Sequence, residues 1–232
     1  MQRRLGINIA LFIIIGLILW YGIFVLKGEE YYTVSMAIIV VGLLGFLLCF
    51  ENSKPSVELL AMLAALCGFA IAARIAFFFL PQIKPIAAVI IIAGVAFGAE
   101  AGFVMGAVSA FVSNFYFGQG AWTPFQMFAL GLIGYFAGVI FRKRKHKVWI
   151  ALYGFFAVVI FYGGIVDLNT LFYASREPTK SMVMAVYLQG LPYNAMFGAS
   201  TAVFLFLLYE PIIRRLDRIC RKYRFVDKVD EK

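Results

Sequence analysis

The residues best suited to specific chemistry lie between Ser113 and Gln126, where polar side chains, aromatic rings, glycines and a proline separate two apolar segments. The glycines permit backbone angles that are closed to other residues. Pro124 fits the first turn of a helix, with Thr123 before it as the N-cap. We therefore expect a tight turn between two membrane helices. It would hold these side chains at or near one membrane surface: Asn114, Tyr116, Gln119, Trp122 and Gln126.

Residue types alone leave two interpretations of this turn open. Trp and Tyr are typical anchors in the headgroup region of a membrane. Amides beside aromatic rings are also typical of ligand sites, which are largely apolar and are oriented by a few polar groups. A second group of such residues enters the last apolar segment and supplies further candidates: Tyr187, Gln189, Tyr193 and Asn194.

Arg74 is the only basic residue well inside an apolar run. A charge inside a membrane is costly, which makes Arg74 a candidate functional residue. It also lies close enough to the end of its run for the long side chain to reach the interface. The sequence leaves both roles open.

Several kinds of chemistry have no support in the sequence. It contains no phosphate-binding glycine loop, no metal-ligand cluster, no HExxH motif and no nucleophile elbow. Carboxylates inside the apolar runs are nearly absent, which argues against an ion-driven pump. We therefore expect no catalytic residues, no metal site and no cofactor of the chain's own. If the protein moves a solute, a partner must supply the energy.

The composition indicates how these residues are positioned. The chain is 63% hydrophobic and 14% charged, whereas a soluble domain has about half and a quarter. Several apolar runs approach the roughly 20 residues that cross a bilayer. This predicts an all-α polytopic helix bundle embedded in lipid. The net charge of +9 gathers beside the apolar runs, as orientation signals do, and does not predict nucleic-acid binding.

We expect about eight spans. The run from residue 85 to 117 would form a helix of roughly 50 Å, too long for a hydrocarbon core of about 30 Å, so we divide it near Gly98 to Glu100. A polar connection follows the seventh span at residues 167–180. The other expected spans are 5–26, 31–50, 56–80, 124–141, 148–166 and one that begins between 181 and 191 and ends near 210.

The basic residues predict the orientation of the bundle. Most of them lie near the two termini and at residues 142–147, which places these segments and both termini in the cytoplasm. The polar, aromatic-rich connections, including the turn at Pro81, then face outward.

Small residues recur at helical spacing in two places. One stripe begins with Ala61 and Ala65, and a longer one runs from Gly94 to Ala110. Such stripes let membrane helices approach closely. Packing within the chain is the simpler interpretation of both, and docking onto another membrane subunit is the alternative for Ala61 and Ala65. If the longer stripe is divided at Gly98, each half would pack separately.

Residues from 84 to 134 resemble the substrate-binding S component of energy-coupling-factor (ECF) vitamin transporters, most closely the cobalamin-type members called CbrT. The resemblance covers about 55–210, the six-helix core of that family. It is carried by these residues: Lys84-Pro85, Gly94, Gly98, Gly102-Phe103, Gly106-Ala107, Ser113-Asn114-Phe115, Gly118-Gln119-Gly120, Trp122-Thr123-Pro124-Phe125-Gln126-Met127 and Gly131-Leu132-Ile133-Gly134.

The resemblance implies capture of a vitamin from outside, with no enzymatic activity. It implies partnership in the plasma membrane with an EcfT-type coupling subunit and two ATPase subunits, which hydrolyse ATP. Ala61 and Ala65 match the family's docking pattern. We expect cobalamin or a related corrinoid as cargo. The alternatives are another vitamin or precursor, such as a thiamine precursor, and a membrane protein without a transport role.

The resemblance also divides the chain. We expect two additional helices in 1–54, the six-helix core in 55–212 and a basic cytoplasmic tail in 213–232. The candidate substrate-binding residues are Arg74, Asn114, Tyr116, Gln119, Trp122, Gln126, Tyr187, Tyr193 and Asn194.

Overall fold

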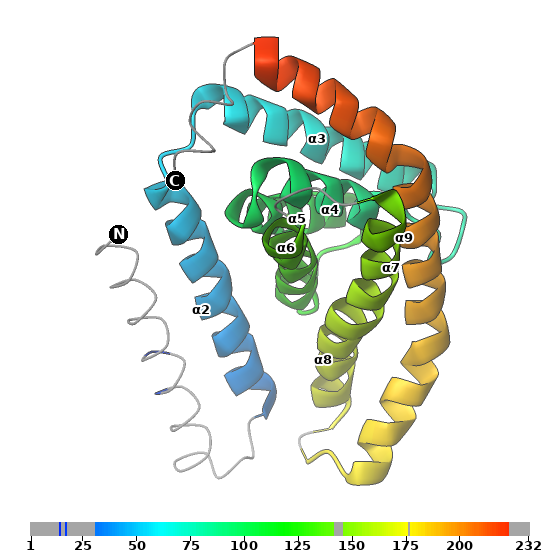
Figure 1. Ribbon diagram of the computed structural model, residues 1–232. Coiled ribbons are helices and arrows are strands. Elements are labelled where there is room, and N and C mark those ends of the chain that lie inside the picture. Colours follow the sequence, from blue (N-terminus) through cyan, green and yellow to red (C-terminus); the bar gives the residue numbers. More distant parts are fainter. Residues whose placement is uncertain (1–13, 15–16, 18–30, 142–145, 176, 223–232) are drawn as a thin grey trace.

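The computed structural model describes Ile14, Leu17 and residues 31–141, 146–175 and 177–222 (Figure 1). Within these ranges every regular element is a helix, which confirms the predicted all-α membrane bundle. The expected first span at 5–26 lies outside the described residues, apart from Ile14 and Leu17. The described helices that are long and apolar enough to cross a membrane cover Tyr32–Asn52, Val57–Ala76, Thr123–Ile140, Lys147–Ala174 and Lys180–Cys220.

The bundle has a central group of helices with others around it. Figure 1 shows α4, α5 and α6 in the middle, α2 on one side, and α7, α8 and α9 on the other. The π-helix η1 joins α7 to α8. The bounds are α2 Tyr31–Asn52, α3 Val57–Ala76, α4 Ile86–Phe97, α5 Ala99–Phe117, α6 Thr123–Ile140, α7 Lys147–Ala157, η1 Val158–Gly163, α8 Gly164–Ala174 and α9 Lys180–Lys222.

The division of the long apolar run at Gly98 is confirmed. Gly98 has φ of 95°, in the left-handed region that favours glycine, and its N–H donates to the Gly94 carbonyl. The short helix α4 that ends there is buried along most of its length and forms much of the main core.

The longer glycine stripe packs within the chain. A Cβ at Gly94 would lie 2.2 Å from the carbonyl oxygen of Gly134 on α6, and a Cβ at Gly102 would lie 2.4 Å from the same atom. Glycine therefore allows both α4 and α5 to contact the α6 backbone. The expectation that the two halves pack separately is wrong, because both meet Gly134.

The expected end of the seventh span near residue 166 is also wrong. The helix passes through the π-helical turn η1 and continues as α8 to Ala174. Asp167 and Asn169 do not end it, because Asp167 accepts a hydrogen bond from Asn194 on α9 and Asn169 is buried. Asp167 therefore faces a neighbouring helix.

The last helix is longer than expected at its C-terminal end. α9 continues past Glu210 to Lys222, and Ile213 and Leu216 belong to the main core. Figure 1 shows the helix bending over the bundle in this part. Pro192 and Pro211 lie inside it, and proline removes a helical hydrogen bond and favours a kink.

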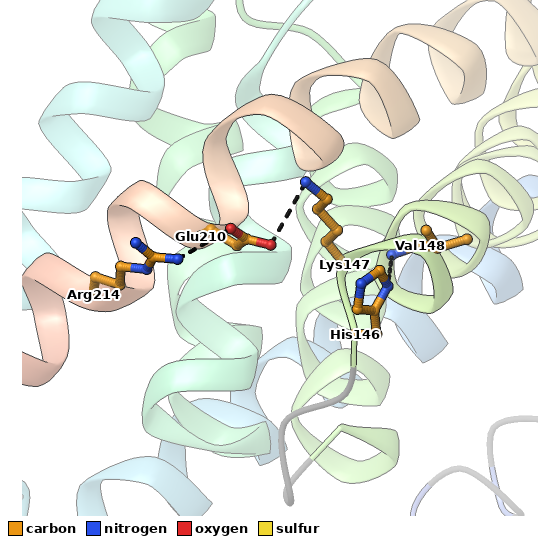
Figure 2. A network of polar contacts seen from close by, with 5 residues as sticks. All are labelled: His146, Lys147, Val148, Glu210 and Arg214. Carbon is orange, nitrogen blue, oxygen red and sulfur yellow. Dashed lines mark hydrogen bonds and ion pairs between the residues drawn. The ribbon is translucent and has the colours of Figure 1, made fainter.

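Polar contacts join the start of α7 to α9 beside this bend. Figure 2 shows Glu210 between Lys147 and Arg214, with N–O distances of 3.6 Å and 3.4 Å. His146 accepts a hydrogen bond from the Val148 N–H and caps α7. The ion pairs are partly exposed, so each contributes little to stability.

Candidate binding site

The turn between α5 and α6 is shorter than the stretch 113–126 from which it was predicted. α5 extends to Phe117, Gly118 follows with φ of 101°, and α6 begins at Thr123. Pro124 lies in the first turn of α6, as expected. Thr123 is not the N-cap, because Trp122 occupies that position.

The Thr123 hydroxyl instead holds the turn together. It accepts a hydrogen bond from the Gly120 N–H at 3.2 Å and donates to Gln119 Oε1 at 2.9 Å. The Gln119 amide in turn donates to the Phe111 carbonyl at 2.9 Å. Gln119 thus fastens the turn back onto α5.

Arg74 points into the bundle, so the interpretation that it reaches the interface is wrong. The residue is 8% exposed. Its Nη1 donates to Ser113 Oγ and, at 3.0 Å, to Asn114 Oδ1, and its guanidinium lies 4.3 Å from the centre of the Phe117 ring. α5 therefore supplies both the acceptors and the aromatic face that hold this charge.

A chain of hydrogen bonds continues from Asn114. Its Nδ2 donates to Thr123 Oγ1 at 3.2 Å and to Gln126 Oε1 at 2.8 Å. Gln126 Nε2 then donates to the hydroxyl of Tyr162 at 3.2 Å. The network joins α3, α5, α6 and η1 through side chains far apart in the sequence.

A central cavity of about 20 Å³ opens beside this network. The connection between α3 and α4 contributes Gln82, whose φ of 57° is unusual for a residue with a side chain, and Lys84. Burial lowers the pKa of Lys84, and the positive charge of Arg74 lowers it further. The cavity is lined by Arg74, Gln82, Lys84, Ile86, Gln126, Leu130, Tyr162 and Phe197.

A larger groove of about 420 Å³ lies between the η1–α8 segment and α9. Its polar groups are already oriented: Asn194 Nδ2 donates to Asp167 Oδ2 at 2.7 Å, and the Tyr187 hydroxyl donates to the Gly164 carbonyl at 2.9 Å. The groove is lined by Val159, Ile160, Gly163, Gly164, Asp167, Met184, Tyr187, Leu188, Leu191 and Asn194.

The linings of the groove and the cavity include residues that are close together in the sequence. On η1, Tyr162 lines the cavity and its neighbour Gly163 lines the groove. On α9, Phe197 lines the cavity and Asn194, one turn earlier, lines the groove. The Tyr162 and Phe197 rings pack edge to face, with centres 5.1 Å apart. This aromatic contact joins η1 and α9, the two elements that contribute residues to both spaces.

The structure brings together some of the predicted site residues. Arg74, Asn114 and Gln126 belong to one network, with Gln119 joined to it through Thr123, and Tyr187 and Asn194 line the groove. Other candidates line neither space and are exposed, among them Tyr116 at 59%, Trp122 at 44% and Tyr193 at 59%. A binding role for these residues stays a prediction.

The site contains residues that the sequence did not identify as binding candidates. Gln82 and Lys84 lie in the predicted turn at Pro81, and that prediction could have identified them as candidates. Tyr162 has no polar neighbour nearby in the sequence, and only its contact with Gln126 reveals its position.

Ala61 and Ala65 are both exposed on α3 within the described part of the chain. A Cβ at Gly68, on the same helix, would meet no atom within 4 Å. The described helices therefore leave this face uncovered, and its docking role stays a prediction.

The fold and these two spaces define a multi-pass membrane protein with a candidate small-molecule site. A family model described as "ECF-type riboflavin transporter, S component" matches residues 51–214. This match covers well over half of the chain, so the chain belongs to the ECF transporter S-component family. Comparisons with curated proteins and with solved structures give no match.

The match confirms the resemblance to ECF S components but not to the cobalamin-type members, because the matched model is of the riboflavin type. Membership implies a small-molecule substrate and association with the membrane coupling subunit and the ATPase subunits of ECF transporters. The family consists of transporter subunits rather than enzymes.

Proposed function

We propose that this chain captures riboflavin or a vitamin of similar size from outside the cell. An EcfT-type subunit and two ATPases, which supply the energy, then complete its import. The observation that carries this proposal is that η1 and α9 contribute residues to both the groove and the polar cavity, and that all the lining residues lie within the matched range 51–214.

The volume of the groove favours a cargo smaller than cobalamin. Ligand pockets span roughly 300–1,000 Å³. At about 420 Å³ the groove lies near the lower end of that range, which suits a flavin. A corrinoid is several times larger than a flavin and would require α8 and α9 to separate. Cobalamin therefore becomes the weaker candidate, although it was the cargo expected from the sequence.

The lining of the groove also suits a flat, partly polar ring. Ile160, Leu188 and Leu191 offer apolar walls. Asn194 and Asp167 supply amide and carboxylate groups that could pair with the ring's imide and carbonyl groups. A few placed polar groups on apolar walls are the usual means of orienting such a ligand.

Equilibrium binding to the purified chain tests the proposal, with riboflavin followed by the quenching of its fluorescence. Cobalamin, thiamine and a thiamine precursor complete the panel, each followed by calorimetry. We expect saturable binding of riboflavin and weaker or no binding of cobalamin. Failure of every vitamin to bind would overturn the proposed function, whereas preference for cobalamin would overturn the size assignment alone.

A further inference from the structure

We infer that the central cavity selects cargo that carries an anionic oxygen group, either a phosphate or a carboxylate. This assignment rests on the proposed function and goes beyond it, since riboflavin itself is neutral. It depends on which hydrogen-bonding groups face the cavity and on where the chain leaves charge unbalanced.

The hydrogen bonds beside the cavity have a fixed order of donor and acceptor, which begins at Arg74 and ends at Tyr162. Arginine has only donors, so the oxygen of Asn114 must face Arg74 and its amide nitrogen must face Gln126. The Gln126 amide nitrogen then faces Tyr162, whose oxygen accepts. The Tyr162 hydroxyl keeps its own hydrogen for another acceptor. Arg74 therefore fixes Tyr162 as a donor at the cavity.

Other donors at the cavity have no acceptor among the described residues. Arg74 uses only Nη1 in its hydrogen bonds, which leaves Nε and Nη2. The Lys84 backbone N–H donates to Ser200, but its Nζ forms no hydrogen bond and lies 5.4 Å from the centre of the Phe117 ring. The side chains facing this space thus offer donors in excess.

The positive charge is also unbalanced. In the described part of the chain, no carboxylate forms an ion pair with Arg74 or Lys84. Two cations at one partly buried site repel each other, and a buried charge without a counter-charge costs free energy. An anionic ligand would supply both the missing acceptors and the missing charge.

Phosphate and carboxylate are the groups that fit this arrangement. Both are acceptors without donors when ionised, and the guanidinium of arginine binds both through paired N–H groups. The carbonyl oxygens of a neutral ring could accept the hydrogen bonds but would leave both charges unbalanced. This is why the lining favours an anion over riboflavin.

The cavity must widen to admit such a group. Its volume of about 20 Å³ is room for roughly one water molecule. One wall of the cavity is the α3–α4 connection, which carries Gln82 and Lys84 and whose Phe79 is 88% exposed. We expect this connection to shift outward when cargo binds.

Binding of matched ligand pairs to the full-length purified chain tests the inference. Riboflavin and riboflavin 5′-phosphate differ by a phosphate, as do thiamine and thiamine monophosphate. Biotin and biotinamide form the carboxylate arm. In at least one pair we expect the anionic member to bind about tenfold more tightly, the effect of one or two hydrogen bonds to a charged group. The arm that shows the preference identifies the anion.

Variants of the lining residues test whether a preference for the anionic ligand arises at the cavity. Arg74→Gln and Lys84→Gln should each reduce the preference to within about threefold, while the exposed control Lys180→Gln should leave it unchanged. Lys84→Gln keeps the test valid if Arg74→Gln fails to fold, because Lys84 lies in a connection. Equal binding within every pair, or a preference that survives Lys84→Gln, would overturn the inference and leave the proposed function standing. No binding by any member would overturn both.

Discussion

Tyr162 lies on a π-helical turn, where it joins the hydrogen-bond chain from Arg74 and lines the central cavity. π-helical turns within α-helices occur frequently at functional sites. The extra residue in such a turn changes which side chains point inward. Here the turn presents Tyr162 to the cavity and the adjacent Gly163 to the groove.

Replacing Tyr162 with Phe tests this role. The change removes a donor to the cargo and leaves the Gln126 amide without its acceptor, so affinity for the preferred ligand should fall about threefold to tenfold. The matched control is Tyr153→Phe, because the Tyr153 hydroxyl donates to the Ile133 carbonyl and lines neither space. Calorimetric titration of both variants provides the measurement. Equal losses in the two would assign Tyr162 a structural role only.

Lys84 gives the site a predicted pH dependence. The protonated form attracts an anion, and it loses its proton as pH rises through its pKa. Burial, with a further contribution from Arg74, lowers that pKa below the ordinary value of about 10.4. Affinity for the anionic ligand should therefore decline at a lower pH than an exposed lysine would require.

Titrations from about pH 8 upward check this prediction, since a phosphate ester, whose second pKa is about 6, is almost fully ionised there. Arg74 and Tyr162 are the other ionisable groups that line the cavity. Lys84→Arg is the control, because arginine keeps its charge and should flatten the profile. A decline that persists in Lys84→Arg would point to a different group.

At the scale of elements, the glycine contact between α4, α5 and α6 fixes the scaffold on which the site lies. The carbonyl of Gly134 approaches both Gly94 and Gly102, while a Cβ on Gly134 itself would lie 2.2 Å from the Gly102 carbonyl oxygen. Since backbone atoms stand on both sides, no side chain can move to relieve the overlap.

Gly134→Ala should therefore lower stability by about 1–3 kcal/mol or more, the usual cost of overpacking. Gly68→Ala makes the same change in α3, where the added Cβ meets no atom within 4 Å. The midpoint of thermal unfolding in detergent should fall for the first variant and not for the second. A similar midpoint for Gly134→Ala and the parent protein would contradict the close approach.

The uncovered face of α3 carries a prediction about partners. Ala61→Leu combined with Ala65→Leu should abolish vitamin uptake by the assembled transporter and leave binding to the isolated chain intact, because the larger side chains prevent close helix approach. Ala199→Leu, at an exposed position on α9, is the matched control. Loss of ligand binding in the double variant would instead indicate that this face packs within the chain.

The sequence predicted those helix boundaries that depend on residues close together in the chain. The division at Gly98 followed from helix length and a glycine, and Pro124 marked the start of α6. The errors have a long-range cause: Asp167 looked like a helix end, but its partner Asn194 comes 27 residues later. Likewise Arg74 looked able to reach the interface, and only the acceptors on α5 show why it turns inward.

The site could be predicted only in part, for the same reason. Arg74, Asn114 and Gln126 were identified from polar side chains inside or beside apolar runs, which is a local signal. Tyr162 and Phe197 look like ordinary apolar surface or core residues until the helices are assembled. The direction of the hydrogen bonds, and with it the expected charge of the cargo, depends on contacts between α3, α5, α6 and η1.

In the molecule as a whole, the binding site and the uncovered α3 face are separate and serve two different steps, cargo binding and docking. The side chains that line the central cavity come from α3, α4, α6, η1, α9 and the α3–α4 connection, while Ala61 and Ala65 are exposed on α3. This separation suits a subunit that holds its cargo while a partner supplies the energy. It also allows capture and docking to be tested by independent mutations.

A structure of the chain with bound riboflavin or riboflavin 5′-phosphate is the decisive test of the proposed binding site. We expect the ring to lie between the η1–α8 segment and α9, beside Asn194. The phosphate, when present, should lie within hydrogen-bond distance of Arg74 and Lys84, with the α3–α4 connection displaced. A ligand bound elsewhere, with the groove and the cavity both unchanged, would contradict both the proposed site and the inferred anion preference.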